Sequence, residues 1–95
     1  MSGPYSIGGD RWQGLSKLIE EAGEVIQVGG KIIGINGEEE HWDGTNLRER
    51  MQDELADLLA AVRFFIQHNE FDQSKIDARV EHKFGLFQEW KKKGQ

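Results

Sequence analysis

Four carboxylates in two pairs are the residues of this chain whose spacing most plainly favours a chemical role. Glu21 and Glu24 are three residues apart, and Glu54 and Asp57 repeat that spacing further along the chain. Residues three apart on an α-helix share one face, so each pair offers two hard oxygen ligands to one small volume. Two such helices packed side by side would form a magnesium site. Acidic pairs also occur as plain solvated surface, so neither pair is decisive alone.

The neighbours of the second pair favour its partial burial. If this segment is helical, Ala61 and Phe64 lie on the same face as Glu54 and Asp57 and continue their stripe. The adjoining face is apolar and consists of Leu47, Met51, Leu55, Leu58, Leu59, Val62, Phe65 and Ile66. Carboxylates that are partly withdrawn from water need a cation nearby. The second pair therefore also predicts a bound metal ion.

The first half of the chain is expected to hold an irregular arm and one helix. Residues 1–9 are rich in glycine, and Asp10 is a candidate N-cap for a helix over about 11–28, which Gly29 and Gly30 should end. The stretch 31–45 contains glycines and acids and is expected to be a loop, with at most a short helical turn over 31–35. The apolar stripe of the first helix is Leu15, Leu18, Ile19, Ala22, Val25 and Ile26.

Two further helices are predicted after this loop. Asn46 with Glu49 three residues later is typical of a capped helix start, and this helix should last to about residue 69. Asp72 can cap the third helix, whose stripe is Ile76, Val80, Phe84 and Phe87. No segment alternates long enough to predict a strand. The expected fold is therefore a single all-α domain over residues 1–95.

Composition excludes several classes of function. The chain has 95 residues, 37% of them hydrophobic, which allows one small core that would gain from burying more surface in an oligomer. A net charge of -5 gives no footprint for a nucleic-acid duplex. Without cysteine there is no disulfide, thiolate metal site or cysteine nucleophile. No signal-peptide pattern or membrane-length apolar run is present, so a cytoplasmic protein without membrane partners is expected.

The run Lys17–Gln27, followed by Asp53–Leu59, resembles the MazG-like branch of the all-α nucleoside triphosphate pyrophosphohydrolases. The signature of that family is E-x-x-E followed by E-x-x-D on the next long helix, and the resemblance extends over about residues 12–90. It implies an Mg²⁺ site, with Mn²⁺ as a substitute, and hydrolysis of a nucleoside triphosphate, by preference a dNTP, to the monophosphate and pyrophosphate for nucleotide-pool control. The implied ligands are Glu21, Glu24, Glu54 and Asp57.

The link between the two motifs is at the long end of the family's range, which leaves base recognition open. Aromatic residues for stacking are expected from Trp12 at the start of the first helix and Trp42 in the loop, with Asn36 and His41 available to hydrogen-bond a base edge. Tyr5 and Trp90 are further aromatic residues, although a tryptophan in a small domain is more often a core or interface anchor.

Basic residues and one further glutamate are candidates for the reaction itself. Glu20 lies four residues before Glu24 and could position or deprotonate the attacking water, or could be an ordinary exposed glutamate. The resemblance suggests phosphate binding by Arg79 and Lys83, with His82 beside them, while a solvated basic face is the alternative. Lys31 is a further phosphate candidate.

The predicted second helix has more apolar surface than one chain can cover. Ala56, Ala60, Ala61 and Phe64 extend its apolar character beyond the stripe that faces the other helices, which predicts at least a homodimer. The resemblance implies dimers or tetramers with active sites near subunit contacts. The rival function is a non-enzymatic acidic module for helical oligomerisation. A di-iron site is excluded because the E-x-x-H spacing falls in the loop, and an EF-hand is excluded because its ligand order is missing.

Overall fold

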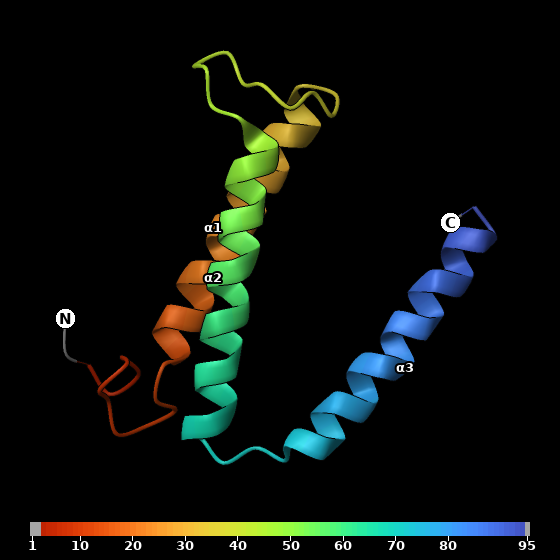
Figure 1. Cartoon of the computed structure of the whole chain (residues 1–95). Helices are drawn as coiled ribbons and strands as arrows, with labels where there is room; N and C mark the ends of the chain where they lie inside the picture. The colour runs from red at the N-terminus through yellow and green to blue at the C-terminus, as the bar shows by residue number, and fades with distance from the viewer. Residues whose placement is uncertain (1–2, 95) are drawn as a thin grey trace.

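The computed structural model describes residues 3–94, which form three helices in the order α1 (Leu15–Gly34), α2 (Leu47–His68) and α3 (Gln73–Lys92). Helices α1 and α2 form an antiparallel hairpin, and α3 extends away from it (Figure 1). Within residues 3–94 there is no strand, and the only extended pairing is one isolated bridge between Glu40 and Asn46. The expected all-helical protomer is confirmed.

The packed core lies between α1 and α2 and is small. Val28 and Leu47 are 0% and 1% exposed, and Ala61 and Ile66 complete the buried apolar set. Asn69, just beyond α2, donates from Nδ2 to the Gln13 carbonyl at 2.9 Å and ties the end of α2 to the turn before α1. Burial of the facing stripes therefore fixes the two helices against each other.

Helix α1 continues through Gly29 and Gly30, so the predicted helix end at this pair is wrong. The helix runs to Gly34, so residues 31–34 of the short turn expected over 31–35 form the last turn of α1. Each glycine costs a helix about 1 kcal/mol relative to alanine. Val28 lies in the core and Gly29 faces Met51 of α2. Packing against α2 stabilises this turn, and local propensity does not end it.

The start of α1 also differs from its prediction. Residues 3–14 form successive turns, α1 begins at Leu15, and its N-cap is Gly14 rather than Asp10. Gly14 has φ 87°, and a Cβ there would approach Phe64 Cδ1 to 2.8 Å. Only glycine fits both this left-handed backbone and this contact. Residues 1–2 of the predicted N-terminal arm lie outside the described residues.

The caps of the other two helices are confirmed. Asn46 Oδ1 accepts a hydrogen bond from the Glu49 backbone N–H at 2.9 Å, and Asp72 Oδ1 accepts one from the Lys75 N–H at 3.2 Å. Each satisfies a backbone donor that has no partner within its helix. Because α1 runs to Gly34 and α2 begins at Leu47, the loop between them covers residues 35–46 and is shorter than expected.

Helix α3 makes no comparable packing with α1 or α2 among the described residues. The stripe that should bury it, including Val80, Phe84 and Phe87, is exposed. The radius of gyration is 16.4 Å, whereas a compact domain of this length has about 12 Å. The protomer therefore presents an open hairpin and an arm-like third helix (Figure 1).

Replacing Gly30 by alanine should raise the free energy of unfolding by about 0.5–1 kcal/mol, because the residue is helical and restricting the unfolded chain favours folding. A Cβ at this position meets nothing within 4 Å. Thermal and urea denaturation measure the change. Gly37 is the control, since it is equally open but has φ +82°. Gly37→Ala should lower stability by about 1 kcal/mol, and equal effects of the two variants would contradict a continuous α1.

Candidate metal centre

Three of the four predicted carboxylates meet where α1 and α2 pack. Glu21 of α1 and Glu54 and Asp57 of α2 each offer an oxygen, and these oxygens lie within 4.8 Å of one another. Glu54 and Asp57 share a face because they are three residues apart, and the hairpin brings Glu21 to the same place. Glu54 is only 9% exposed, while Asp57 is open to solvent. We call these three residues the acidic triad.

The carboxylates of the acidic triad repel one another. Partial burial raises the pKa of Glu21 above its ordinary value of 4.5, and the negative charges of Asp57, Glu20 and Glu54 raise it further. The nearby ammonium of Lys17 opposes this rise in pKa. Like charges held close favour either a proton or a cation between them. A positive charge bound between these carboxylates would therefore relieve their repulsion.

Glu24, the fourth predicted ligand, lies outside the triad and contacts a cation of the protein. Arg50 Nε donates to Glu54 Oε1 at 3.1 Å, and Arg50 Nη2 lies 3.7 Å from Glu24 Oε2. Arg50 thus bridges the acids of both helices. Sequence reasoning missed this residue, although its position four residues before Glu54 is the spacing of a helical ion pair.

The donor chemistry of the triad fits a hard divalent cation. Carboxylate oxygens are the ligands that Mg²⁺ and Mn²⁺ prefer, and Mg²⁺ commonly uses one or two carboxylates while it keeps several waters. The solvent-exposed side of Asp57 leaves room for such waters. The described residues therefore include three grouped carboxylates that can bind a metal ion.

A cavity of ≈ 330 Å³ adjoins the triad. Its lining combines two triad acids with a cation and apolar side chains: Glu21, Asp57, Lys17, Ile7, Ala60, Ala61 and Phe64. The predicted continuation of the acidic stripe by Ala61 and Phe64 agrees with this lining. Phe64 also stacks on His68, with ring centroids 4.0 Å apart. The carboxylates therefore sit at the edge of a mostly apolar hollow.

Glu20 and Lys17 form an exposed pair beside this cavity. Lys17 Nζ lies 3.2 Å from Glu20 Oε2. Glu20 is not a member of the triad. Sequence reasoning quoted Lys17 in the first motif without giving it a role. Its spacing of four residues from Glu21 was the signal that could have identified it.

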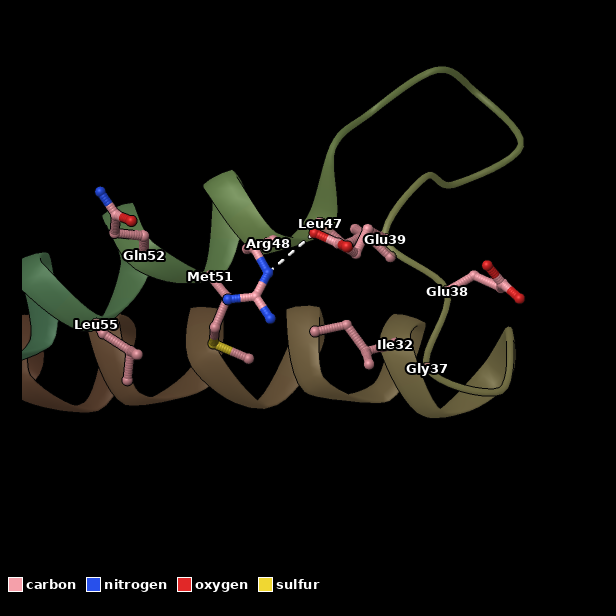
Figure 2. A pocket seen from close by; sticks show the side chains of 9 residues that line it. All are labelled: Ile32, Gly37, Glu38, Glu39, Leu47, Arg48, Met51, Gln52 and Leu55. Carbon is pink, nitrogen blue, oxygen red and sulfur yellow. Dashed lines mark hydrogen bonds and ion pairs between the residues drawn. The ribbon is translucent and has the colours of Figure 1, made fainter.

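A larger groove of ≈ 420 Å³ lies at the loop end of the hairpin (Figure 2). Ile32, Met51 and Leu55 line its floor, and the ion pair between Arg48 Nε and Glu39 Oε1, 2.9 Å long, crosses it. None of the triad acids lines it. The groups able to do chemistry lie in the smaller cavity, which we therefore take as the candidate site.

The predicted phosphate-binding residues lie apart from the triad. Arg79, His82 and Lys83 are on α3, which extends away from the hairpin (Figure 1), and Lys83 Nζ lies 5.7 Å from the centre of the Phe87 ring. Lys31 is in the last turn of α1, about 10 Å along the helix axis from Glu24. A single protomer therefore does not bring these cations to the acids.

The predicted base-binding residues are also dispersed. Trp12 lies in the turn before α1, not within the helix as expected, and stacks with Phe65 and Phe71 at 6.2 and 6.0 Å. Trp42 is 87% exposed in the loop, where it packs on His41. Asn36 follows α1 with φ 58°. Trp42 and Asn36 thus lie at the loop end of the hairpin.

Comparison of the sequence with known protein families, curated proteins and solved structures found no match. Among the described residues, no helix has the length and apolar character needed to cross a membrane.

Glu21→Gln should stabilise the metal-free protein at neutral pH, because the amide removes a charge that Asp57 and Glu54 repel. The folded-state pKa of Glu21 is raised, so the stability linked to its protonation is complete below 4.5 and is lost as pH rises through the raised pKa. Thermal unfolding across pH should therefore give matching wild-type and variant curves in acid and diverging curves above it.

The control for this measurement is Glu20→Gln, which alters an exposed carboxylate paired with Lys17. This variant should give a smaller gain, because Glu20 also repels Glu21 but is itself paired with Lys17. A stabilisation by Glu21→Gln that stayed constant from acid to neutral pH would contradict charge repulsion within the triad.

Proposed function

We propose that this protein is an Mg²⁺-dependent nucleoside triphosphate pyrophosphohydrolase of the MazG-like kind, acting by preference on a dNTP to control a nucleotide pool. The observation that carries the proposal is the meeting of Glu21, Glu54 and Asp57 within 4.8 Å on two packed helices. Glu54 and Asp57 are the E-x-x-D pair of the family resemblance, and Glu21 is the first acid of its E-x-x-E pair. A triphosphate needs a hard cation beside a hollow for the rest of the substrate, and the cavity at the triad supports this.

Each side chain at the site has a proposed task. The triad holds the ion, which when bound supplies Lewis-acid stabilisation of the phosphate oxygens. Lys17 lines the cavity and offers its ammonium to a phosphate, and Phe64 offers an apolar wall to the sugar or base. A water attacks phosphorus, the α–β anhydride bond breaks, and pyrophosphate leaves. Glu20 is our candidate to take the proton of that water, acting through the exposed edge of the site.

Glu54→Gln should abolish pyrophosphate release while leaving the helices intact, because the amide keeps the shape of the side chain and loses the charge of a ligand. Loss of a ligand charge in a metal site should lower turnover by about a hundredfold or more. Pyrophosphate release from a panel of ribo- and deoxyribonucleotides, with and without Mg²⁺ or Mn²⁺, measures it, and circular dichroism checks the fold.

The matched control is Asp53→Asn, one residue before Glu54 on the same helix and outside the triad. It should retain wild-type turnover. Near wild-type turnover in Glu54→Gln would contradict the metal site. Failure of the wild-type protein to bind a divalent cation or turn over any nucleotide would favour the rival function of a non-enzymatic oligomerisation module.

We further propose that the working form is a homodimer, with a homotetramer as a possible further assembly. The accessible surface is 7471 Å², roughly 1,900 Å² above the value of about 5,600 Å² for a compact monomer of this mass. A standard interface buries about 800 Å² per partner. Ile19, Ile26 and Ile33, spaced seven residues apart on α1, are 63, 74 and 80% exposed. The unburied surface is thus large enough and apolar enough for a stable second copy.

Helix α3 suits the role of a contact with that second copy. It carries five basic and three acidic residues, whereas the loop between α1 and α2 carries four acids and no Lys or Arg. Opposite charge favours pairing of α3 with the acidic hairpin of a partner. Such pairing would carry Arg79 and Lys83 toward a partner's site, which is how the predicted phosphate contacts would be made.

Light scattering at micromolar concentration should therefore give the mass of two chains, or of four, rather than one chain of 10.9 kDa. Phe84→Glu should weaken association by about tenfold or more, because it removes the burial of an aromatic ring and adds a charge. Glu81→Gln, also exposed on α3 but outside the apolar stripe, is the control and should associate normally. A folded wild-type monomer would contradict the proposed dimer.

A further inference from the structure

The side chain of Arg50 holds together acids that the metal site also needs. Its Nε donates to Glu54 Oε1 at 3.1 Å, and its Nη2 lies 3.7 Å from Glu24 Oε2. Glu54 is at once a partner of Arg50 and a member of the triad. Its side chain is 12% exposed, so little water is available to solvate its charge. Arg50 is therefore the resident cation of this half of the site.

A divalent cation at the triad must share Glu54 with this guanidinium. Two positive charges that use one carboxylate repel each other, and the repulsion is strengthened where water is scarce. Glu24, the fourth acid of the motif, is likewise engaged by Arg50 rather than grouped with the triad. Arg50 and the metal ion thus compete for the acids of the motif.

We propose that Arg50 is an internal counter-ion that yields Glu24 and Glu54 to the metal ion and then binds the phosphate chain of the nucleotide. This inference rests on the proposed function and names a phosphate-binding residue that the sequence did not. The guanidinium remains charged at any physiological pH and presents a planar fork of donors that matches phosphate oxygens. Its side chain is half-exposed, so it is free to turn toward a ligand.

Arg50 lies closer to the acids of the site than the basic residues of α3 that were predicted to bind phosphate. Arg79 and Lys83 lie on α3, apart from the hairpin, whereas Arg50 already contacts an acid of each motif. Lys17 serves the other side of the triad, where it lines the cavity with Glu21 and Asp57. One protomer therefore offers two cations that flank the acids.

This arrangement couples the binding of the metal to the binding of the anion. Metal binding releases the guanidinium, and a polyphosphate that holds the guanidinium removes the competitor of the metal. By linkage, each ligand then raises the affinity for the other by the same factor. Removal of the charge of Arg50 should consequently strengthen the binding of metal alone and weaken the binding of polyphosphate to the metal-loaded protein.

The test is titration calorimetry of the full chain with Mg²⁺ alone, and with pyrophosphate at saturating Mg²⁺. Arg50→Gln should bind Mg²⁺ about tenfold tighter, since one competing charge beside a dication is lost. It should bind pyrophosphate about tenfold more weakly, the usual worth of one charge-assisted contact. Arg50→Lys keeps the charge without the fork, so Mg²⁺ affinity should stay within about twofold of wild type while pyrophosphate binding weakens.

Arg48→Gln is the matched control. Arg48 is on the same helix and forms a similar ion pair, with Glu39, across the groove at the loop end (Figure 2). This variant should leave both affinities unchanged. Circular dichroism confirms folding of each variant, and Arg50→Lys carries the test if Arg50→Gln does not fold.

The possible results separate this inference from the proposed function. Equal Mg²⁺ affinity in wild type and Arg50→Gln would overturn the competition and leave the metal site standing. Tighter Mg²⁺ binding with unchanged pyrophosphate binding would overturn the phosphate role. Absence of Mg²⁺ binding by the wild type would overturn the metal site and this inference together.

Discussion

Mutual repulsion among carboxylates at the contact between α1 and α2 is the constraint on which the rest of this structure depends. Glu21, Glu54 and Asp57 lie within 4.8 Å of one another, at the packed seam that contains the core residues Val28 and Ala61. Apolar burial along the seam holds the acids together, and their repulsion opposes that burial. A positive charge placed among these carboxylates would reduce their repulsion and so stabilise the packed helices. This is the physical basis for proposing a cation site.

The buried core along this seam is small. Few side chains are fully buried, α3 leaves its apolar stripe exposed, and the seven-residue isoleucine repeat of α1 faces solvent. Exposed apolar surface of this extent is the basis of the proposed association with a second copy. Binding of a cation would neutralise the excess negative charge at the triad. Association with a second copy would bury the exposed apolar surface along α1 and α3.

The sequence predicted correctly those features that depend on residues close together in the chain. Asn46 and Asp72 cap their helices as expected, and the three-residue spacing of Glu54 and Asp57 placed both on one face. Features that depend on tertiary packing were missed. The helix continues through Gly29 and Gly30 because Val28 is buried and Gly29 faces Met51 of α2, and the bridge from Arg50 to Glu24 exists only once the hairpin has formed. The separation of α3 could not be predicted either, since an apolar stripe does not specify which surface covers it.

The balance of charge at the site bears on how the proposed nucleotide substrate would bind. Glu20, Glu21, Glu24, Glu54 and Asp57 are the acids at the site, and Lys17 and Arg50 are the cations that contact or flank them. The carboxylates outnumber these cations, so a free polyphosphate would meet net repulsion. A divalent ion that enters first, or together with the phosphates, reverses this balance locally although the whole chain remains acidic. The same charges that favour a metal ion would thus exclude an unaccompanied triphosphate, so selectivity for the metal-bound form would follow from electrostatics.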